Sequence, residues 1–323
     1  MGSLRAVCYG YGVKRFKKIY IEISNICNLQ CSFCPEVERG KKLMSAQNFA
    51  HILKKVAPFT EQITLHLMGE PLAHPEFEKI LEICDEENHQ GEAVKINLTT
   101  NAVLIKRKQE VLLKCKSLHQ INFSVHSFKD NFPQKEIAPY LESLIDFSKA
   151  LKLVQPETYV NFRLWNLRDD LAHKEINQMI IHELNQAFSS EISDKIDVAF
   201  KKSKKLTEKI YLNFDSQFRW PDPKDPVRSC TGTCYGLETQ LAIHADGTVV
   251  PCCLDKEARL ELGNLLEQDL VDILQSPRAQ KMRFGFSEGN LVEDLCQKCT
   301  FIKRFDRKAQ SLKTGDSIDL RSP

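Results

Sequence analysis

Short runs of alternating apolar and polar residues recur along the chain, and longer segments with helical spacing separate them. The first run, with Glu22 and Ser24 at its polar positions, predicts a strand over about 18–24. Ser45 then precedes apolar residues three and four apart, which predicts a capped helix through Val56. The same patterns predict strands over 62–68, 95–99, 120–126 and 158–164, a weaker strand near 195–200, and helices from about 75 and over 105–116, 135–153 and 168–187.

This alternation of strands and helices predicts parallel β-α units with right-handed crossovers. Six units are too few for a closed eight-stranded barrel and suit an open one. We therefore expect an α/β fold, a partial (β/α)6 TIM-type barrel over 17–215, after an N-terminal extension over 1–16. In barrels of this kind the functional side chains gather at the C-terminal ends of the strands.

The pattern changes after a turn-rich linker, Pro221–Pro226. Two apolar runs joined by Asp246-Gly247 predict a β-hairpin, and 265–275 has helical spacing. We assign 228–302 to a small cysteine-rich domain built from this hairpin and helix, and 303–323 to a C-terminal tail.

Composition excludes several classes of protein. The 323 residues are 42% hydrophobic, which is ample for a globular core, and a net charge of +2 gives no global attraction to nucleic acid or membranes. There is no run of 18 apolar residues, and the first residues lack the apolar centre of a signal peptide, so we expect a cytoplasmic protein.

The 12 cysteines are clustered, which favours a reducing compartment and metal ligation over disulfides. Cys27, Cys31 and Cys34 have the spacing Cys-x3-Cys-x2-Cys directly after the first predicted strand. Iron–sulfur clusters are usually held by four thiolates, so three ligands in one loop leave one iron open. The alternative is a zinc site or three buried thiols.

A second group of cysteines follows the linker. The preferred ligands of one cluster are Cys234, Cys252, Cys296 and Cys299. The predicted hairpin brings Cys234 and Cys252 together, and Cys296 and Cys299 form a Cys-x2-Cys knuckle. Cys253 is an alternative to Cys252, because adjacent strand residues point to opposite faces, and Cys230 is a further spare. A structural zinc is the main alternative, since zinc ribbons also combine paired cysteines with a hairpin.

The three-cysteine loop, with Phe33 before its last cysteine, resembles that of the radical SAM family. The resemblance implies a [4Fe-4S] cluster whose open iron binds S-adenosylmethionine, which is cleaved to a 5′-deoxyadenosyl radical that abstracts hydrogen from the substrate. Met68-Gly69-Glu70-Pro71 looks like the family's Gly-Gly-Glu-Pro motif, with Met68 replacing the first glycine. The resemblance implies S-adenosylmethionine contacts from Phe33 near the adenine, Met68, Gly69 and Glu70 at the amino group, Asn101 and Ser124 at the ribose, and Arg163 at the carboxylate.

The segment from Cys234 to Cys252 resembles the opening of the SPASM and twitch auxiliary domains. No cysteine follows Cys299, which matches the shorter twitch form with one auxiliary [4Fe-4S] cluster. Four cysteine ligands leave no open iron, which favours a cluster that accepts an electron from the substrate; with only three ligands, substrate could bind the iron. The interpretation is a radical SAM oxidoreductase or maturase for a peptide or small molecule, supplied with electrons by a donor such as flavodoxin or ferredoxin.

Two other functions stay open on the sequence. The basic run Lys201–Lys205 and the basic tail permit a radical SAM enzyme that modifies transfer RNA, although the aromatic interleaving typical of nucleic-acid binding is absent. The non-enzymatic alternative is a zinc-stapled binding protein, which metal analysis separates from a protein with two iron–sulfur clusters.

Overall fold

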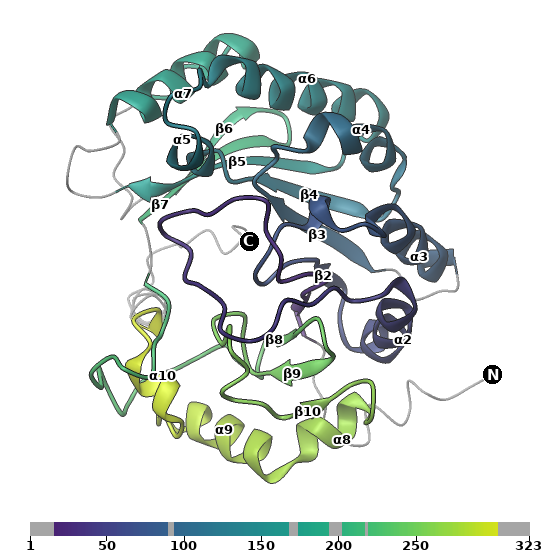
Figure 1. The fold of residues 1–323 in the computed structure, drawn as a ribbon, viewed down its shortest axis with the longest axis vertical. Helices are drawn as coiled ribbons and strands as arrows, with labels where there is room; N and C mark the ends of the chain where they lie inside the picture. Colours follow the sequence, from purple (N-terminus) through teal and green to yellow (C-terminus); the bar gives the residue numbers. More distant parts are fainter. Residues whose placement is uncertain (1–15, 90–93, 168–173, 194–201, 217–218, 303–323) are drawn as a thin grey trace. The chain divides into compact units, whose positions relative to one another are not determined.

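The computed structural model describes residues 16–89, 94–167, 174–193, 202–216 and 219–302 (Figure 1). Helices alternate with mostly parallel strands, so the predicted α/β class is confirmed. Two compact units divide the described chain: the first takes in 16–25, 37–63 and 219–302, and the second takes in 26–36 and the described parts of 64–216. The predicted domain boundaries, which divide the chain by motif, stay a prediction.

The second unit is a sheet with helices along one side (Figure 1). Its strands lie in the order β3-β4-β5-β7-β6, the first four parallel and β6 antiparallel to β7. The strands are β3 (Lys95–Thr100), β4 (Leu118–Phe123), β5 (Tyr159–Leu167), β6 (Ser203–Thr207) and β7 (Ile210–Ser216). The helices are η2 (Pro71–Ala73), α3 (Phe77–His89), α4 (Ile105–Lys114), α5 (His126–Asn131), α6 (Ala138–Val154) and α7 (Lys174–Phe188).

Aromatic residues fasten the helices of the second unit to its sheet. The ring of Phe123 on β4 lies edge-on to Phe147 of α6, with centroids 6.1 Å apart. Phe162 on β5 lies 6.1 Å from Phe188 of α7. Alternate strand residues point to opposite faces, so these contacts mark the face that the helices cover.

A row of neutral amides follows the other face of this sheet. Asn122 donates a hydrogen bond to Asn97 at 2.7 Å, and Asn161 donates to Asn122 at 3.0 Å. Asn213 on β7 extends the row by donating to Asn161 at 2.9 Å. The three amides on β3, β4 and β5 are buried, and their mutual hydrogen bonds offset the cost of removing them from water.

In the first unit the strands lie in the order β10-β9-β8-β1-β2. β1 pairs with β8 in parallel, Ile19 opposite Leu241 and Ile21 opposite Ile243, and β8 and β9 form the predicted hairpin, which is confirmed. Gly247 has φ 90° in its turn, a conformation that glycine adopts readily. The elements are β1 (Lys18–Ile21), α2 (Ala46–Val56), η1 (Ala57–Phe59), β2 (Gln62–Thr64), β8 (Gln240–Ile243), β9 (Thr248–Val250), β10 (Gly263–Asn264), α8 (Leu270–Gln275), α9 (Pro277–Ser287) and α10 (Asp294–Lys298).

The helix predicted from Ser45 to Val56 is confirmed as α2. The Ser45 hydroxyl accepts a hydrogen bond from the Asn48 amide at 3.1 Å, as an N-cap does, and Phe49, Ile52 and Val56 turn a buried stripe toward the core. None of the described helices is both long and apolar enough to cross a bilayer.

Several predicted boundaries are wrong. The strands expected to reach Ser24 and Met68 end at Ile21 and Thr64. The strand expected through His126 ends at Phe123, because Ser127 donates its hydroxyl proton to the Ser124 carbonyl at 2.6 Å and the chain turns into α5. These errors share one cause, since the alternating pattern continues into loops that follow the strands.

The C-terminal helices also differ from expectation. The helix expected from Leu265 begins at Leu270, since Asn264 accepts a side-chain hydrogen bond from the Leu266 amide and forms a turn there. Helices α9 and α10 were not predicted. The weak strand expected near 195–200 lies outside the described residues, and the next strand parallel to β5 is β7.

Candidate functional site

The loop that carries the first three cysteines lies in the second unit. The amide of Cys34 donates to the Cys31 carbonyl at 3.0 Å, which closes a tight turn. The Cys34 thiol donates a hydrogen bond to the Cys31 sulfur, which lowers the pKa of Cys31 and raises the pKa of Cys34. Burial raises the pKa of the Cys27 thiol to about 11, and the charges of Glu70 and Cys31 add to this. The three sulfurs therefore lie close enough to interact electrostatically.

The donor chemistry of this loop suits an iron–sulfur cluster, which is held by cysteine thiolates. Within the described residues, no three His, Cys, Asp or Glu side chains are already arranged around a common metal position. The turn brings Cys31 and Cys34 together, and Cys27 lies within electrostatic range of both. The roles of Cys27, Cys31 and Cys34 as iron ligands stay a prediction.

Asn101, at the end of β3, contacts the cysteine loop. Its side-chain amide donates to the Asn28 carbonyl oxygen at 2.8 Å and approaches the Cys27 sulfur at 3.8 Å. Its backbone carbonyl accepts a hydrogen bond from the Tyr140 hydroxyl at 2.9 Å. Asn101 therefore supports the loop, and its predicted contact with the ribose stays a prediction.

Glu70 is buried and joins its own turn to the end of β3. Its carboxylate accepts hydrogen bonds from the Thr100 hydroxyl at 2.6 Å, the Asn101 amide at 2.7 Å and the Leu72 amide at 3.0 Å. Burial raises the pKa of Glu70 to about 6, although these bonds favour the charged form. A carboxylate offers about four acceptor positions, so one remains for an ammonium ligand.

The two residues before Glu70 form the sharpest part of this turn. Gly69 has φ 76°, in the left-handed region that side chains with a Cβ avoid. Met68, which stands where the resembled motif has glycine, is buried. The structure thus requires the glycine at 69, whereas it accommodates the larger side chain at 68.

Arg163, late in β5, has its side chain held by two neighbours. Its Nη1 donates to the Thr99 hydroxyl at 3.3 Å, and its guanidinium carbon lies 4.5 Å from the centroid of the Trp165 ring. Stacking on an aromatic ring orients a guanidinium, whose planar fork of donors matches the geometry of a carboxylate. The predicted contact between Arg163 and the ligand carboxylate stays a prediction.

His126 lies between the cysteine loop and β5. Its ring centroid is 4.9 Å from that of Phe33, and its Nδ1 lies 3.0 Å from the Arg163 carbonyl oxygen. Ser124 directly follows β4, and its backbone amide donates to the Thr100 carbonyl at 2.9 Å. Phe33, Ser124 and Arg163 all lie in the second unit with the cysteine loop, as the prediction requires.

The second group of cysteines lies in the first unit. Burial is the main cause that raises the pKa of each of Cys234, Cys252, Cys296 and Cys299, and the charge of a neighbouring cysteine adds to it in every case. A Cβ on Gly236 would lie 3.1 Å from the Pro251 carbonyl oxygen and 3.5 Å from the Cys234 sulfur. The close passage of the two chain segments at Gly236 brings the first two predicted ligands together.

The two spare cysteines behave differently. Cys253 is half-buried near Cys234 and Cys252, and the Lys18 charge and hydrogen bonding with Tyr20 partly counter the rise that burial causes in its pKa. Cys230 is exposed. The thiols that interact are thus the four predicted ligands and Cys253, and the choice between Cys252 and Cys253 as ligand stays open.

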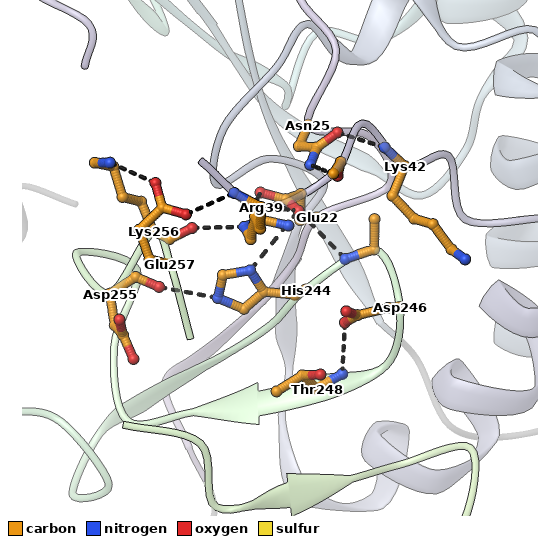
Figure 2. Close-up of polar contacts among 12 residues, drawn as sticks. Glu22, Asn25, Arg39, Lys42, His244, Asp246, Thr248, Asp255, Lys256 and Glu257 are labelled. Atoms are coloured by element: carbon orange, nitrogen blue, oxygen red, sulfur yellow. Dashed lines mark hydrogen bonds and ion pairs between the residues drawn. The ribbon is translucent and has the colours of Figure 1, made fainter. Parts of the chain in front are cut away.

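One buried cluster of charges in the first unit was not predicted (Figure 2). Glu22 was expected on a polar strand face, but it is buried between Arg39 and the Ala245 amide, which donates at 3.3 Å. Arg39 also donates from Nε to the Lys256 carbonyl at 2.5 Å and from its backbone to Glu257 at 3.0 Å. Glu22 directly follows β1, which ends at Ile21, so the alternation of that strand does not decide whether the Glu22 side chain meets solvent.

Comparison with known proteins identifies both parts of the chain. Residues 21–160 match the model of the radical SAM superfamily, and residues 234–300 match that of SPASM, an iron-sulfur cluster-binding domain. The chain is 24% identical over 291 residues to a protein named probable GTP 3′,8-cyclase from Methanococcus maripaludis (strain C7), covering 80% of this chain and 91% of that protein. It is also 24% identical over 288 residues to a probable GTP 3′,8-cyclase from Methanocaldococcus jannaschii, with 81% and 89% covered.

Solved structures share this fold. BtrN, in complex with AdoMet and 2-DOIA, is 16% identical with a TM-score of 0.53, covering 89% of this chain and 94% of that one. Streptococcus suis SuiB bound to S-adenosylmethionine is 16% identical with a TM-score of 0.59, covering 93% and 77%. At such identity the likeness concerns the fold alone.

The chain therefore contains a radical SAM domain and a C-terminal SPASM domain. The resemblance drawn from the cysteine loop is confirmed. These two domains imply [4Fe-4S] clusters and S-adenosylmethionine as cofactors, and the thiol groups of the two units fit such clusters by the chemistry of their donors.

Proposed function

We propose that this chain is a radical SAM oxidoreductase whose second cluster accepts an electron from the substrate. The observation that carries the proposal is the group of interacting thiols in the SPASM domain, which includes the four predicted ligands Cys234, Cys252, Cys296 and Cys299. Four thiolates complete the usual ligand set of a [4Fe-4S] cluster. A cluster without an open iron is suited to electron transfer rather than to substrate binding.

The proposed reaction balances as a two-electron oxidation. When bound, the first cluster and S-adenosylmethionine supply one-electron cleavage to methionine and a hydrogen-abstracting 5′-deoxyadenosyl radical. One hydrogen atom leaves a substrate C–H bond, and the substrate then gives up one proton and one electron. Cys234, Cys252, Cys296 and Cys299 would hold the cluster that accepts this electron, and a reduced flavodoxin or ferredoxin would provide the electron that begins the cycle.

The described side chains supply binding and orientation. The remaining acceptor position of Glu70 suits the ammonium of S-adenosylmethionine, and Arg163, stacked on Trp165, suits its carboxylate. The hydrogen bond from Nδ1 of His126 ties β5 to the helix that follows β4, which fixes Arg163 relative to Phe33.

Two reactions fit the proposed class, dehydrogenation of an alcohol and crosslinking of a peptide, since each removes two electrons from the substrate. The amide row of Asn97, Asn122 and Asn161 does not choose between them, because these side chains are buried and hydrogen bonded to one another.

A second candidate is ring closure of a purine nucleotide. It is favoured by the relatives named probable GTP 3′,8-cyclase, which align over 79–81% of this chain. Ring closure in which the electron and proton return to the product leaves the substrate mass unchanged. An oxidation lowers that mass by two hydrogen atoms, so mass spectrometry separates the two reactions.

The test is an anaerobic reaction of the cluster-loaded protein with S-adenosylmethionine, reduced flavodoxin and a panel of substrates. We expect 5′-deoxyadenosine together with a product lighter by two hydrogens from an alcohol or peptide. Replacement of both Cys296 and Cys299 by alanine should retain 5′-deoxyadenosine formation and remove the lighter product. Product of unchanged mass from GTP would replace the oxidation by the second candidate, and unaltered oxidation in the double variant would overturn the role of the second cluster.

A further inference from the structure

Two residues of the short helix α5, Asp130 and Asn131, contact three consecutive residues of the cysteine loop, 30–32. Asp130 accepts hydrogen bonds from the amide of Ser32 at 2.6 Å and from its hydroxyl at 2.7 Å. Asn131 accepts from the amide of Gln30 at 2.7 Å. These residues are about 100 positions apart in the chain, so the contacts belong to the folded state alone.

Asn131 also points a donor at a sulfur of this loop. Its side-chain nitrogen lies 3.1 Å from the sulfur of Cys31. The same nitrogen donates to the Ser127 carbonyl at 3.0 Å. Both N–H bonds of the amide are therefore used, one inside α5 and one toward the cysteine.

The orientation of this amide is fixed by its partners. The Gln30 backbone amide is a donor, so the side-chain atom of Asn131 that faces it must be the oxygen. The nitrogen must then face Cys31 and the Ser127 carbonyl, which is an acceptor. If the amide were turned over, its nitrogen would face the Gln30 N–H, a second donor, and its oxygen would face the Ser127 carbonyl, a second acceptor. The hydrogen bonds to these two partners therefore place the N–H group toward the Cys31 sulfur.

We infer that Asn131 is a positioning residue that donates an N–H···S hydrogen bond to Cys31 and thereby makes the cluster of the cysteine loop easier to reduce. The inference rests on the proposed function, since it takes Cys31 as an iron ligand. Hydrogen bonds to cluster sulfurs and the net charge nearby are among the factors that set cluster reduction potentials. A donor stabilises the more negative, reduced cluster and so raises its potential.

Asp130 provides a built-in comparison. It holds the same loop through Ser32, but both of its contacts there are with nitrogen and oxygen. Its negative charge acts on both Cys31 and Cys34. The charge therefore opposes reduction, whereas the amide of Asn131 favours it, although the two residues are adjacent and both anchor the loop.

The experiment is a redox titration of the full-length, cluster-loaded protein, followed through the EPR signal that responds to added S-adenosylmethionine. This response separates the cluster of the cysteine loop from the second cluster. In Asn131→Leu, which keeps the branching of the side chain and removes the donor, we expect the ratio of reduced to oxidised cluster at a fixed solution potential to fall about tenfold. That corresponds to about 59 mV for a one-electron couple. In Asp130→Asn the ratio should rise.

A third variant guards against loss of the cluster. Asn131→Asp keeps the acceptor for the Gln30 amide and replaces the donor by a negative oxygen, so its ratio should fall at least as far as in Asn131→Leu. If Asn131→Leu does not load iron, the ratio of reduced to oxidised cluster in Asn131→Asp tests the inference instead. Wild-type potential in a loaded Asn131 variant overturns the inference, as do shifts of equal sign in the Asn131 and Asp130 variants, which would indicate general distortion of the loop. A wild-type protein without the responsive signal refutes the proposed function itself, and the inference with it.

Discussion

Arg39 directs one guanidinium nitrogen at both carboxylate oxygens of Glu22, at 2.7 and 2.5 Å (Figure 2). Glu22 is fully buried and the Arg39 side chain is 15% exposed. The guanidinium also donates to the Lys256 carbonyl, close in sequence to the cysteines of the SPASM domain. The pair thus joins β1, the loop after residue 36 and the segment after the β8–β9 hairpin within one unit.

Replacement of Arg39 by Met should leave the Glu22 carboxylate buried without its partner. Loss of one member of a buried ion pair costs about 3–5 kcal/mol of unfolding free energy, and denaturation by guanidinium chloride measures this loss. The double variant Glu22→Leu, Arg39→Met should recover part of it, because no charge is then left unpaired. Lys114→Ala, which breaks the exposed pair with Glu110, is the control and should not change the midpoint. Equal effects of Arg39→Met and Lys114→Ala would contradict the role given to burial.

His244, next to this pair, predicts a dependence of stability on pH. Its Nε2–H donates to the Asp255 carbonyl at 2.9 Å, and burial, with the nearby Arg39 charge, lowers its pKa to about 4. In the unfolded chain the pKa is about 6.5. The unfolded state therefore binds the proton more readily between these values, and the stabilising contribution of neutral His244 is complete above pH 6.5 and lost as pH falls toward 4.

This contribution amounts to about 3 kcal/mol at order of magnitude. The denaturation midpoint should fall between pH 7 and pH 4.5, and His244→Gln, which keeps a donor but does not titrate, should show a smaller fall. A control at His182, exposed on α7, should keep the wild-type pH profile when changed to Gln. Identical profiles for wild type and His244→Gln would contradict the prediction.

The sequence predicts the parts of the site whose spacing is local. The cysteine triad, the Met68–Pro71 turn and the hairpin all lie within short segments. Helix α5 was missed because its six residues are too few to show helical periodicity, and its contacts with the cysteine loop arise only on folding. Glu22 was misplaced because β1 ends at Ile21, so the alternation of the strand no longer decides the environment of residue 22, whose side chain is enclosed by Arg39 and the Ala245 amide.

Cys234 and Cys230 differ in exposure, so their replacement by alanine should affect the iron content of the protein differently. Cys234 is half-buried among interacting thiols, whereas Cys230, four residues earlier, is exposed. Cys234→Ala should lose about four irons per chain, one [4Fe-4S] cluster. Cys230→Ala should keep the wild-type content. Chemical iron analysis of the anaerobically reconstituted proteins measures both. Equal iron loss in the two variants would show that Cys230 takes part in the cluster.

Glu70 predicts how affinity for S-adenosylmethionine changes with pH. The ionised carboxylate accepts bonds from Thr100, Asn101 and Leu72 and keeps one position for the ligand's ammonium, and its pKa is raised to about 6 by burial. A protonated Glu70 attracts the ammonium less and loses an acceptor. Affinity should therefore be full above pH 7 and decline as pH falls through 6.

Glu70→Gln should bind S-adenosylmethionine about tenfold more weakly at pH 7.5, the equivalent of about 1.4 kcal/mol, because one charge-assisted hydrogen bond is lost. Its affinity should also be flat between pH 7.5 and 5.5, since glutamine does not titrate. Calorimetric titration of the cluster-loaded protein measures both effects, with Glu110→Gln on the exposed face of α4 as the matched control. If Glu70→Gln keeps the wild-type decline with pH, another group controls the binding and Glu70 serves only to close its turn against β3.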